Sequence, residues 1–138
     1  MKAALHHINI STERVEEMAA FYRDVLGLED TDEDVPALRM DENVYAGDVA
    51  FLSDGHIHLH IARKDVQAGF RTGQIVNPVL AGHIAYRTED LAGWKAHLEA
   101  SGVPYSDWSN SAVAGWSQIY FYDPDGVVIE VHEVTGEG

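Results

Sequence analysis

The chain has 138 residues, of which 46% are hydrophobic and 23% charged, and this balance is typical of one globular domain. Nine lysines and arginines stand against 23 aspartates and glutamates, and the formal net charge of −14 argues against nucleic-acid binding. Because the chain has no cysteine, disulfides and thiolate ligands are excluded, and a bound metal would need imidazole, carboxylate or backbone oxygen ligands.

The first half of the sequence predicts a strand, a helix and three further strands. Residues 4–10 alternate apolar and polar side chains, as a strand does. The helix that follows ends at Gly27, and its apolar stripe consists of Val15, Met18, Ala19, Tyr22, Val25 and Leu26. Three strands are expected at about 37–42, 48–53 and 57–62, the last two joined by a turn at Asp54-Gly55.

The second half repeats this order after a segment without clear periodicity at 63–79, which we interpret as a connector. A strand is expected within 81–90, a helix over 91–102, and strands around 104–108, 116–122 and 127–133. His7-Ile8 and His83-Ile84 lie 76 residues apart (83 − 7), and Gly27 and Gly102 lie 75 apart (102 − 27). The sequence therefore predicts one domain over 1–138, built from a βαβββ module at about 1–62 and a second at 80–138.

Alternation along the strands also predicts where the histidines lie. In the stretch HIHLHIA at 56–62, the isoleucines and leucine share one face, so the three histidines share the other. The same argument turns His7, His83 and Glu130 away from the helices, whereas His6 is expected on the helix side. A single histidine on a strand is more often structural than a ligand, but the shared face and equivalent positions favour a joint site. The expected ligands of a divalent ion (Fe, Mn, Ni, Co or Zn) are His7, His58, His83 and Glu130. His56 and His60 would then line the rim of the site or orient the ligands by hydrogen bonds.

Four stretches, LHHINI, FYRDVLGLE, GHIAYRTEDL and DPDGVVIEV, together resemble the vicinal oxygen chelate superfamily, which includes glyoxalase I, bleomycin-resistance proteins and extradiol dioxygenases. The resemblance covers both halves. It implies an α+β fold in which two βαβββ modules form a cupped mixed sheet around a metal cleft, with helices on the outer face, often as a homodimer. It also implies ligands at His7, His83 and Glu130, and it puts His58 where glyoxalase I has a glutamate tied to proton transfer.

The resemblance implies a metal-dependent lyase or isomerase that acts on a small substrate chelated through two vicinal oxygens, with Glu130 or His58 as the base. One alternative is an Fe(II) extradiol-type dioxygenase that uses His7, His83 and Glu130. Another is a non-catalytic antibiotic-binding protein. The four ligand-type residues argue against this alternative, because such proteins generally lack the metal ligands. No apolar run is long enough to cross a bilayer and the N-terminal residues lack a signal-peptide pattern, so we expect no membrane association and a cytoplasmic location.

Overall fold

The computed structural model describes residues 1–35 and 37–136. In chain order, its helices and strands are β1 (Ala4–Thr12), α1 (Val15–Asp24), β2 (Glu29–Asp30), β3 (Val49–Ser53), β4 (His58–Arg63), α2 (Ala68–Thr72), β5 (Gly82–Arg87), α3 (Leu91–Ala100), β6 (Ser106–Ser109), β7 (Trp116–Tyr122) and β8 (Val128–Val134). No helix among these residues is long and apolar enough to span a membrane.

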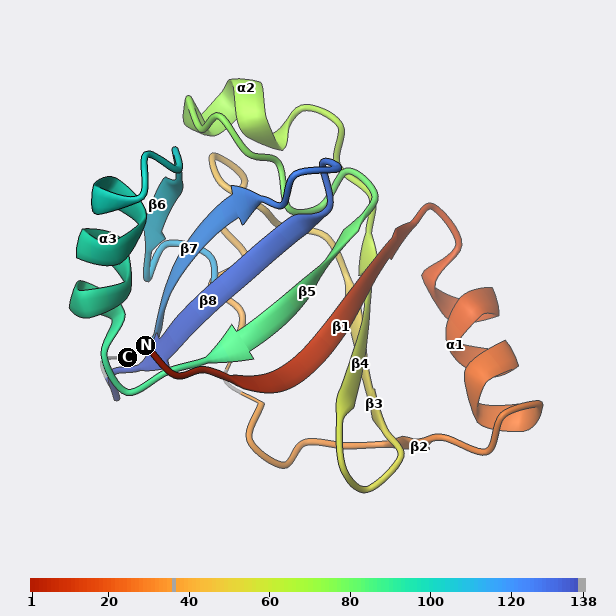
Figure 1. Ribbon diagram of the computed structural model, residues 1–138. Helices are drawn as coiled ribbons and strands as arrows, with labels where there is room; N and C mark the ends of the chain where they lie inside the picture. Colours follow the sequence, from red (N-terminus) through yellow and green to blue (C-terminus); the bar gives the residue numbers. More distant parts are fainter. Residues whose placement is uncertain (36, 137–138) are drawn as a thin grey trace.

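All eight strands belong to one mixed sheet with the order β2-β3-β4-β1-β5-β8-β7-β6. The two central strands, β1 and β5, are antiparallel, and each pairs in parallel with the last strand of its own half, β4 or β8. Read outward from the centre, the two halves have the same order, and the sheet curves between α1 and α3 at its opposite ends (Figure 1). The predicted α+β fold with paired βαβββ units is confirmed.

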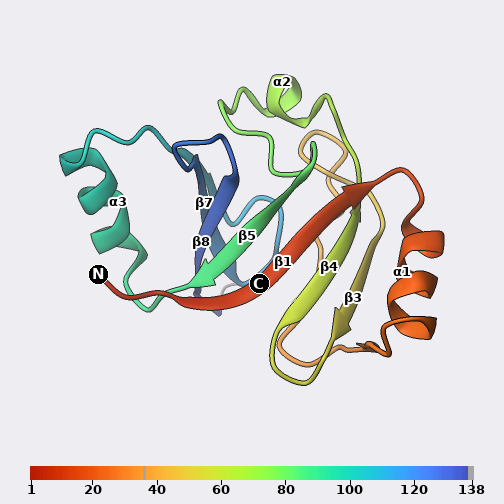
Figure 2. The same cartoon turned by 45° about the vertical axis from the view of Figure 1, so that its right-hand side comes forward.

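Each of the two long helices covers the outer face of one half of the sheet. Val15 and Ala19 of α1 pack on Leu52 and Ile61, and this cluster is fully or almost fully buried. A second cluster joins Leu91 and Leu98 of α3 to Ile119 and Val131. Figure 2 shows the two helices on separate sides of the molecule, with the central strands between them. Because strand residues alternate, this outer packing turns the intervening polar side chains toward the inside of the cup.

A third apolar cluster lies inside the cup and is contributed largely by connecting segments. Its buried members are Tyr45, Ala62, Ala68, Val76, Val79, Trp108 and Tyr120. The segment 63–79 belongs to this cluster and contains the short helix α2, which the lack of periodicity did not reveal. Its ends are tied together by the backbone N–H of Asp65, which donates to the carbonyl of Val79 at 2.9 Å. The connector thus forms part of the wall around the candidate site.

Two sequence predictions about the first half are wrong. Residues 37–42 do not form a strand of the sheet: Leu38 makes only an isolated bridge to Val113, and the two-residue β2 pairs with β3 instead. The apolar stripe of α1 is also shorter than expected, since the helix ends at Asp24 and Val25 and Leu26 are 65% and 57% exposed. Both residues lie in the turn after the helix and point away from the sheet that buries Val15.

Candidate metal centre

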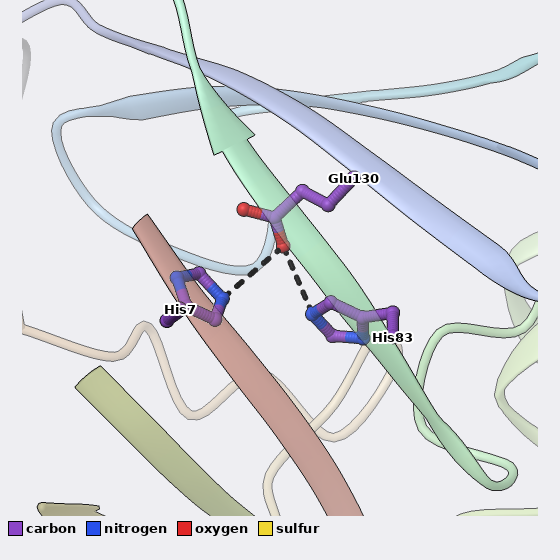
Figure 3. A group of neighbouring side chains, drawn as sticks. All are labelled: His7, His83 and Glu130. Atoms are coloured by element: carbon purple, nitrogen blue, oxygen red, sulfur yellow. Dashed lines mark ion pairs between the residues drawn. The ribbon is translucent and has the colours of Figure 1, made fainter. Parts of the chain in front are cut away.

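Three buried side chains from three neighbouring strands converge inside the cup. His7 comes from β1, His83 from β5 and Glu130 from β8, and one ligand atom of each lies within 4.8 Å of the other two. Figure 3 shows both imidazoles directed at the same carboxylate oxygen, Oε1 of Glu130. That oxygen lies 3.8 Å from Nε2 of His7 and 3.1 Å from Nε2 of His83. The structure therefore brings together three of the four residues that the sequence predicts as ligands.

Hydrogen bonds behind the group orient its side chains. Nδ1 of His83 lies 2.8 Å from the carbonyl oxygen of Pro78, which can only accept, so Nδ1 carries a proton and the neutral ring has its lone pair on Nε2. Nδ1 of His132 lies 2.6 Å from Oε2 of Glu130, and the Tyr120 hydroxyl donates to Oε1 at 3.0 Å. These contacts fix the orientation of the carboxylate.

The electrostatics of the group favour neutral imidazoles around one carboxylate. Burial lowers the pKa of His7 and His60 well below the ordinary histidine value and that of His6 to about 4, so all three are neutral at pH 7. Burial alone would raise the pKa of Glu130, but the neighbouring His7 and the hydrogen bond from His132 outweigh it and hold that pKa well below the usual range. Neutral imidazole and ionised carboxylate are the forms that bind metals.

The positions of His56, His58 and His60 differ from our prediction, in which His58 is the ligand. His60 is buried, its ring stacks on that of His7 with centroids 3.8 Å apart, and it lines the internal cavity. His58 lies on the same side of β4 but outside both the ligand group and the cavity lining, and its ring contacts His6 at 5.0 Å. His56 is exposed in the turn before β4. Of these three histidines, His60 is therefore the one that lines the cavity and contacts a candidate ligand.

Sequence reasoning placed His6 on the helix side, and the structure corrects this. The pairing of β1 with β5 slips between Leu5 and His7, so that His6 is the extra residue of a β-bulge. The bulge turns His6 and His7 to the same face, and their Nδ1 atoms lie 2.8 Å apart. A bulge interrupts the alternation on which the sequence argument depends, and no residue type in ALHHINI marks its place.

A cavity of about 80 Å³ opens beside the ligand group. His7, His60, His83 and Glu130 form its polar side, and most of the remaining wall is apolar or aromatic, as at Phe51 and Trp108. Among the described residues that line it, none is a lysine or arginine. The sheet supplies the ligands, and strands, loops and the connector together supply the apolar wall.

The donor set fits a divalent transition metal ion. Two imidazole nitrogens and a carboxylate oxygen suit Zn, Fe, Mn, Co or Ni. All three side chains are buried, and in each of them the polar atom that faces away from the ion is already hydrogen-bonded. Among the described residues, four buried side-chain polar atoms lack a hydrogen-bond partner, and three of them belong to residues that line the cavity: His60, Trp108 and Gln118. A buried polar atom without a partner costs about 1–3 kcal/mol, which bound ligand atoms would offset.

Comparisons with known proteins agree with this fold. The chain is 27% identical over 129 residues to Glyoxylase I 4 of Arabidopsis thaliana, an alignment that covers 93% of this chain and 69% of that protein. A hypothetical protein of Bacillus halodurans has the same fold with a TM-score of 0.70 at 16% identity, covering 100% of this chain and 99% of that one. Methylmalonyl-CoA epimerase from Mycobacterium tuberculosis follows with a TM-score of 0.67 at 19% identity, covering 94% and 87%. A family model matches residues 4–131, and the chain therefore belongs to the Glyoxalase/Bleomycin resistance protein/Dioxygenase superfamily.

Proposed function

We propose that this protein is a divalent-metal-dependent lyase or isomerase that acts on a small substrate chelated through two neighbouring oxygens. The observation that carries the proposal is the buried group of His7, His83 and Glu130 at the wall of a cavity. The name Glyoxylase I of the curated relative and the name epimerase of a solved structure support chemistry of this class. The homodimer, the cytoplasmic location and the domain boundaries stay predictions.

In this proposal His7, His83 and Glu130 hold the ion, which would act as a Lewis acid on a substrate carbonyl oxygen. Glu130 is an anchoring ligand rather than a base, because both of its oxygens already accept hydrogen bonds from His132 and Tyr120. Burial and the neighbouring Glu130 raise the pKa of Tyr120 well above its usual value, so its hydroxyl keeps its proton and continues to donate.

The proton-transfer role that the family resemblance implies for Glu130 or His58 fits His60 better. His60 lines the cavity beside His7, and its buried Nε2 has no hydrogen-bond partner. In the proposed step Nε2 takes a proton from the carbon beside the carbonyl, and the electron pair of the broken C–H bond moves into the carbonyl group. That carbon carries a hydroxyl group, whose proton passes to the former carbonyl oxygen, and His60 returns the first proton to the former carbonyl carbon. The carbonyl and hydroxyl groups thus exchange places, and no other reactant is consumed.

The wall of the cavity also restricts the substrate. A cavity of roughly 150 Å³ accommodates benzene, so the group of the substrate that enters one of about 80 Å³ has only a few carbon atoms. Because no lysine or arginine stands among its described lining residues, a substrate carboxylate or phosphate that does not reach the ion would have no cationic side chain beside it. We therefore propose a neutral substrate with a short apolar group.

A second function has one observation in its favour. The three residues that the structure groups most closely are two histidines and one carboxylate, the set that non-haem Fe(II) oxygenases use. An Fe(II)-dependent dioxygenase would consume oxygen with a small catechol. The lyase or isomerase would rearrange its substrate without oxygen uptake.

The test begins with protein stripped of metal by a chelator and reloaded separately with Zn²⁺, Ni²⁺, Mn²⁺ and, without oxygen, Fe²⁺. Neutral hemithioacetals and small α-hydroxyketones are offered alongside catechols, with turnover and oxygen uptake followed together. The proposal expects turnover only after reloading and without oxygen uptake. Equal turnover by the stripped protein would overturn it, and oxygen uptake with catechol would establish the dioxygenase instead. Tight binding of an antibiotic to stripped protein, without turnover of any substrate, would establish a binding protein.

A further inference from the structure

Behind the candidate ligands lies a chain of side chains that reaches Asp34, a residue of the loop between β2 and β3. Nδ1 of His7 lies 2.8 Å from Nδ1 of His6, and Nε2 of His6 lies 3.1 Å from Oδ2 of Asp34. A hydrogen bond between two neutral imidazoles needs a proton on one facing nitrogen and a lone pair on the other. The tautomer of His7 is therefore linked to that of His6.

One of the two possible arrangements leaves His7 able to bind a metal. If Nε2 of His6 donates its proton to Asp34, Nδ1 of His6 has the lone pair and accepts from Nδ1–H of His7. Nε2 of His7, which faces Glu130, then carries a lone pair. A ligand nitrogen needs that lone pair, so this is the competent arrangement.

Arg87 favours the opposite arrangement. Its Nη2 lies 3.1 Å from the same Nε2 of His6, and a guanidinium group can only donate. If Arg87 donates there, the proton of His6 moves to Nδ1 and is donated to His7, whose own proton must then occupy Nε2. Arg87 also forms an ion pair with Asp34 and donates from Nε to Nε2 of His132 at 3.0 Å, so it is held beside His6 whichever tautomer is present.

We propose that Asp34 is a positioning residue that, through His6, holds His7 in the tautomer whose Nε2 is free to bind a metal ion. The inference rests on the metal role of His7 proposed above. Asp34 itself touches neither the ligand group nor the cavity, and its side chain is 46% exposed, so its removal leaves the buried core intact. Its effect is exerted on the proton of His6.

The backbone at Asp34 determines which variants are informative. Its φ of 57° lies in the left-handed region, where glycine and asparagine are tolerated and alanine is strained. Asp34→Gly removes the acceptor, whereas Asp34→Asn keeps an oxygen that can accept from His6. Both variants thus tolerate the left-handed backbone, and they differ only in whether the side chain can accept a hydrogen bond from His6.

The experiment measures histidine tautomers in metal-free, ¹⁵N-histidine-labelled protein by NMR, and zinc affinity by competition with a chromophoric chelator. We expect Nδ1–H on His7 in the wild type and in Asp34→Asn, and Nε2–H in Asp34→Gly. Zinc affinity should fall by ~10- to 100-fold in Asp34→Gly, as for other residues that orient ligands, and stay close to wild type in Asp34→Asn. An unchanged His7 tautomer in Asp34→Gly would overturn the inference, whatever happens to affinity. Failure of the wild type to bind zinc would instead overturn the metal site itself, while the tautomers still report on Asp34.

Discussion

His60 and Glu130 occupy equivalent positions in the two halves of the sheet. In the first half, the Cα register pairs His60 with Asn9, two residues after His7. In the second half it pairs Glu130 with Ala85, two residues after His83. The internal repeat thus relates His7 to His83 and His60 to Glu130, and it assigns no such relationship to His58, whose partner is His7 itself.

The positions of His60 in the cavity lining and of His58 outside it predict different results for these two histidines of β4. Replacing the proposed base in His60→Gln should lower kcat by ~10²- to 10⁴-fold, because a positioned general base contributes about that much. His58→Gln should leave kcat within a few-fold, since His58 lies outside the cavity lining. Steady-state kinetics with both variants at saturating metal tests this, and metal content measured in parallel separates loss of the base from loss of the ion. Equal losses of kcat in the two variants would contradict the assignment.

Gly82 is predicted to be essential for the position of His83. Its φ is +141°, and a Cβ added there would lie 2.2 Å from the carbonyl oxygen of Asn9 on the neighbouring strand β1. Gly82→Ala should therefore force β5 and β1 apart and destabilise the fold by roughly 1–3 kcal/mol or more, with a parallel loss of zinc affinity. Urea unfolding and zinc titration measure both effects.

Gly102→Ala provides the matched control, because Gly102 also has positive φ but a Cβ there meets nothing within 4 Å. Backbone strain should lower the free energy of unfolding of this variant by about 1 kcal/mol, and the variant should bind zinc like the wild type. If Gly82→Ala behaved in the same way, the close approach of β5 to β1 would not be what positions His83.

The connector that supports Pro78 and His83 should be stabilised by an ion pair in a pH-dependent manner. The hydrogen bond from Arg71 lowers the pKa of Asp65 below its ordinary value, outweighing the effect of partial burial. A carboxyl group whose pKa falls on folding stabilises the protein above its unfolded pKa of about 3.9, and this contribution is lost as pH falls through the lowered folded value. Asp65→Asn should therefore be roughly 0.5–1 kcal/mol less stable than wild type at pH 7, and the difference should shrink as the pH falls below about 4.

Urea unfolding at pH 7, 5, 4 and 3 measures that difference. Glu17→Gln is a suitable comparison, because Glu17 pairs with Arg14 where both side chains are at least 70% exposed and solvent weakens the attraction. It should change stability little at any of these pH values. A stability gap for Asp65→Asn that is constant from pH 7 to pH 3 would contradict the ion-pair explanation.

The sequence predicted the fold well because alternation and helical periodicity report directly on which face is buried. His7, His83 and Glu130 were placed on the inner face by their apolar neighbours alone, and the structure groups them. The exact pairing of β1 with β4 was not readable, since His58 and His60 lie on the same face and a shift of two residues preserves the pattern. Nor could the sequence reveal the bulge at His6, because it depends on how β1 pairs with a strand about 80 residues away. Asp34 was missed because loop residues follow no periodic pattern.

The most direct test of this account is the stoichiometry of metal binding by the purified, metal-stripped protein. Calorimetric titration with Zn²⁺ should give one ion per chain, and His7→Gln, His83→Gln and Glu130→Gln should each weaken binding severely while the far-UV circular dichroism stays that of the wild type. If the wild type binds no Zn²⁺, or if the variant with all three substitutions still binds it, the proposal that these residues form a metal centre is contradicted.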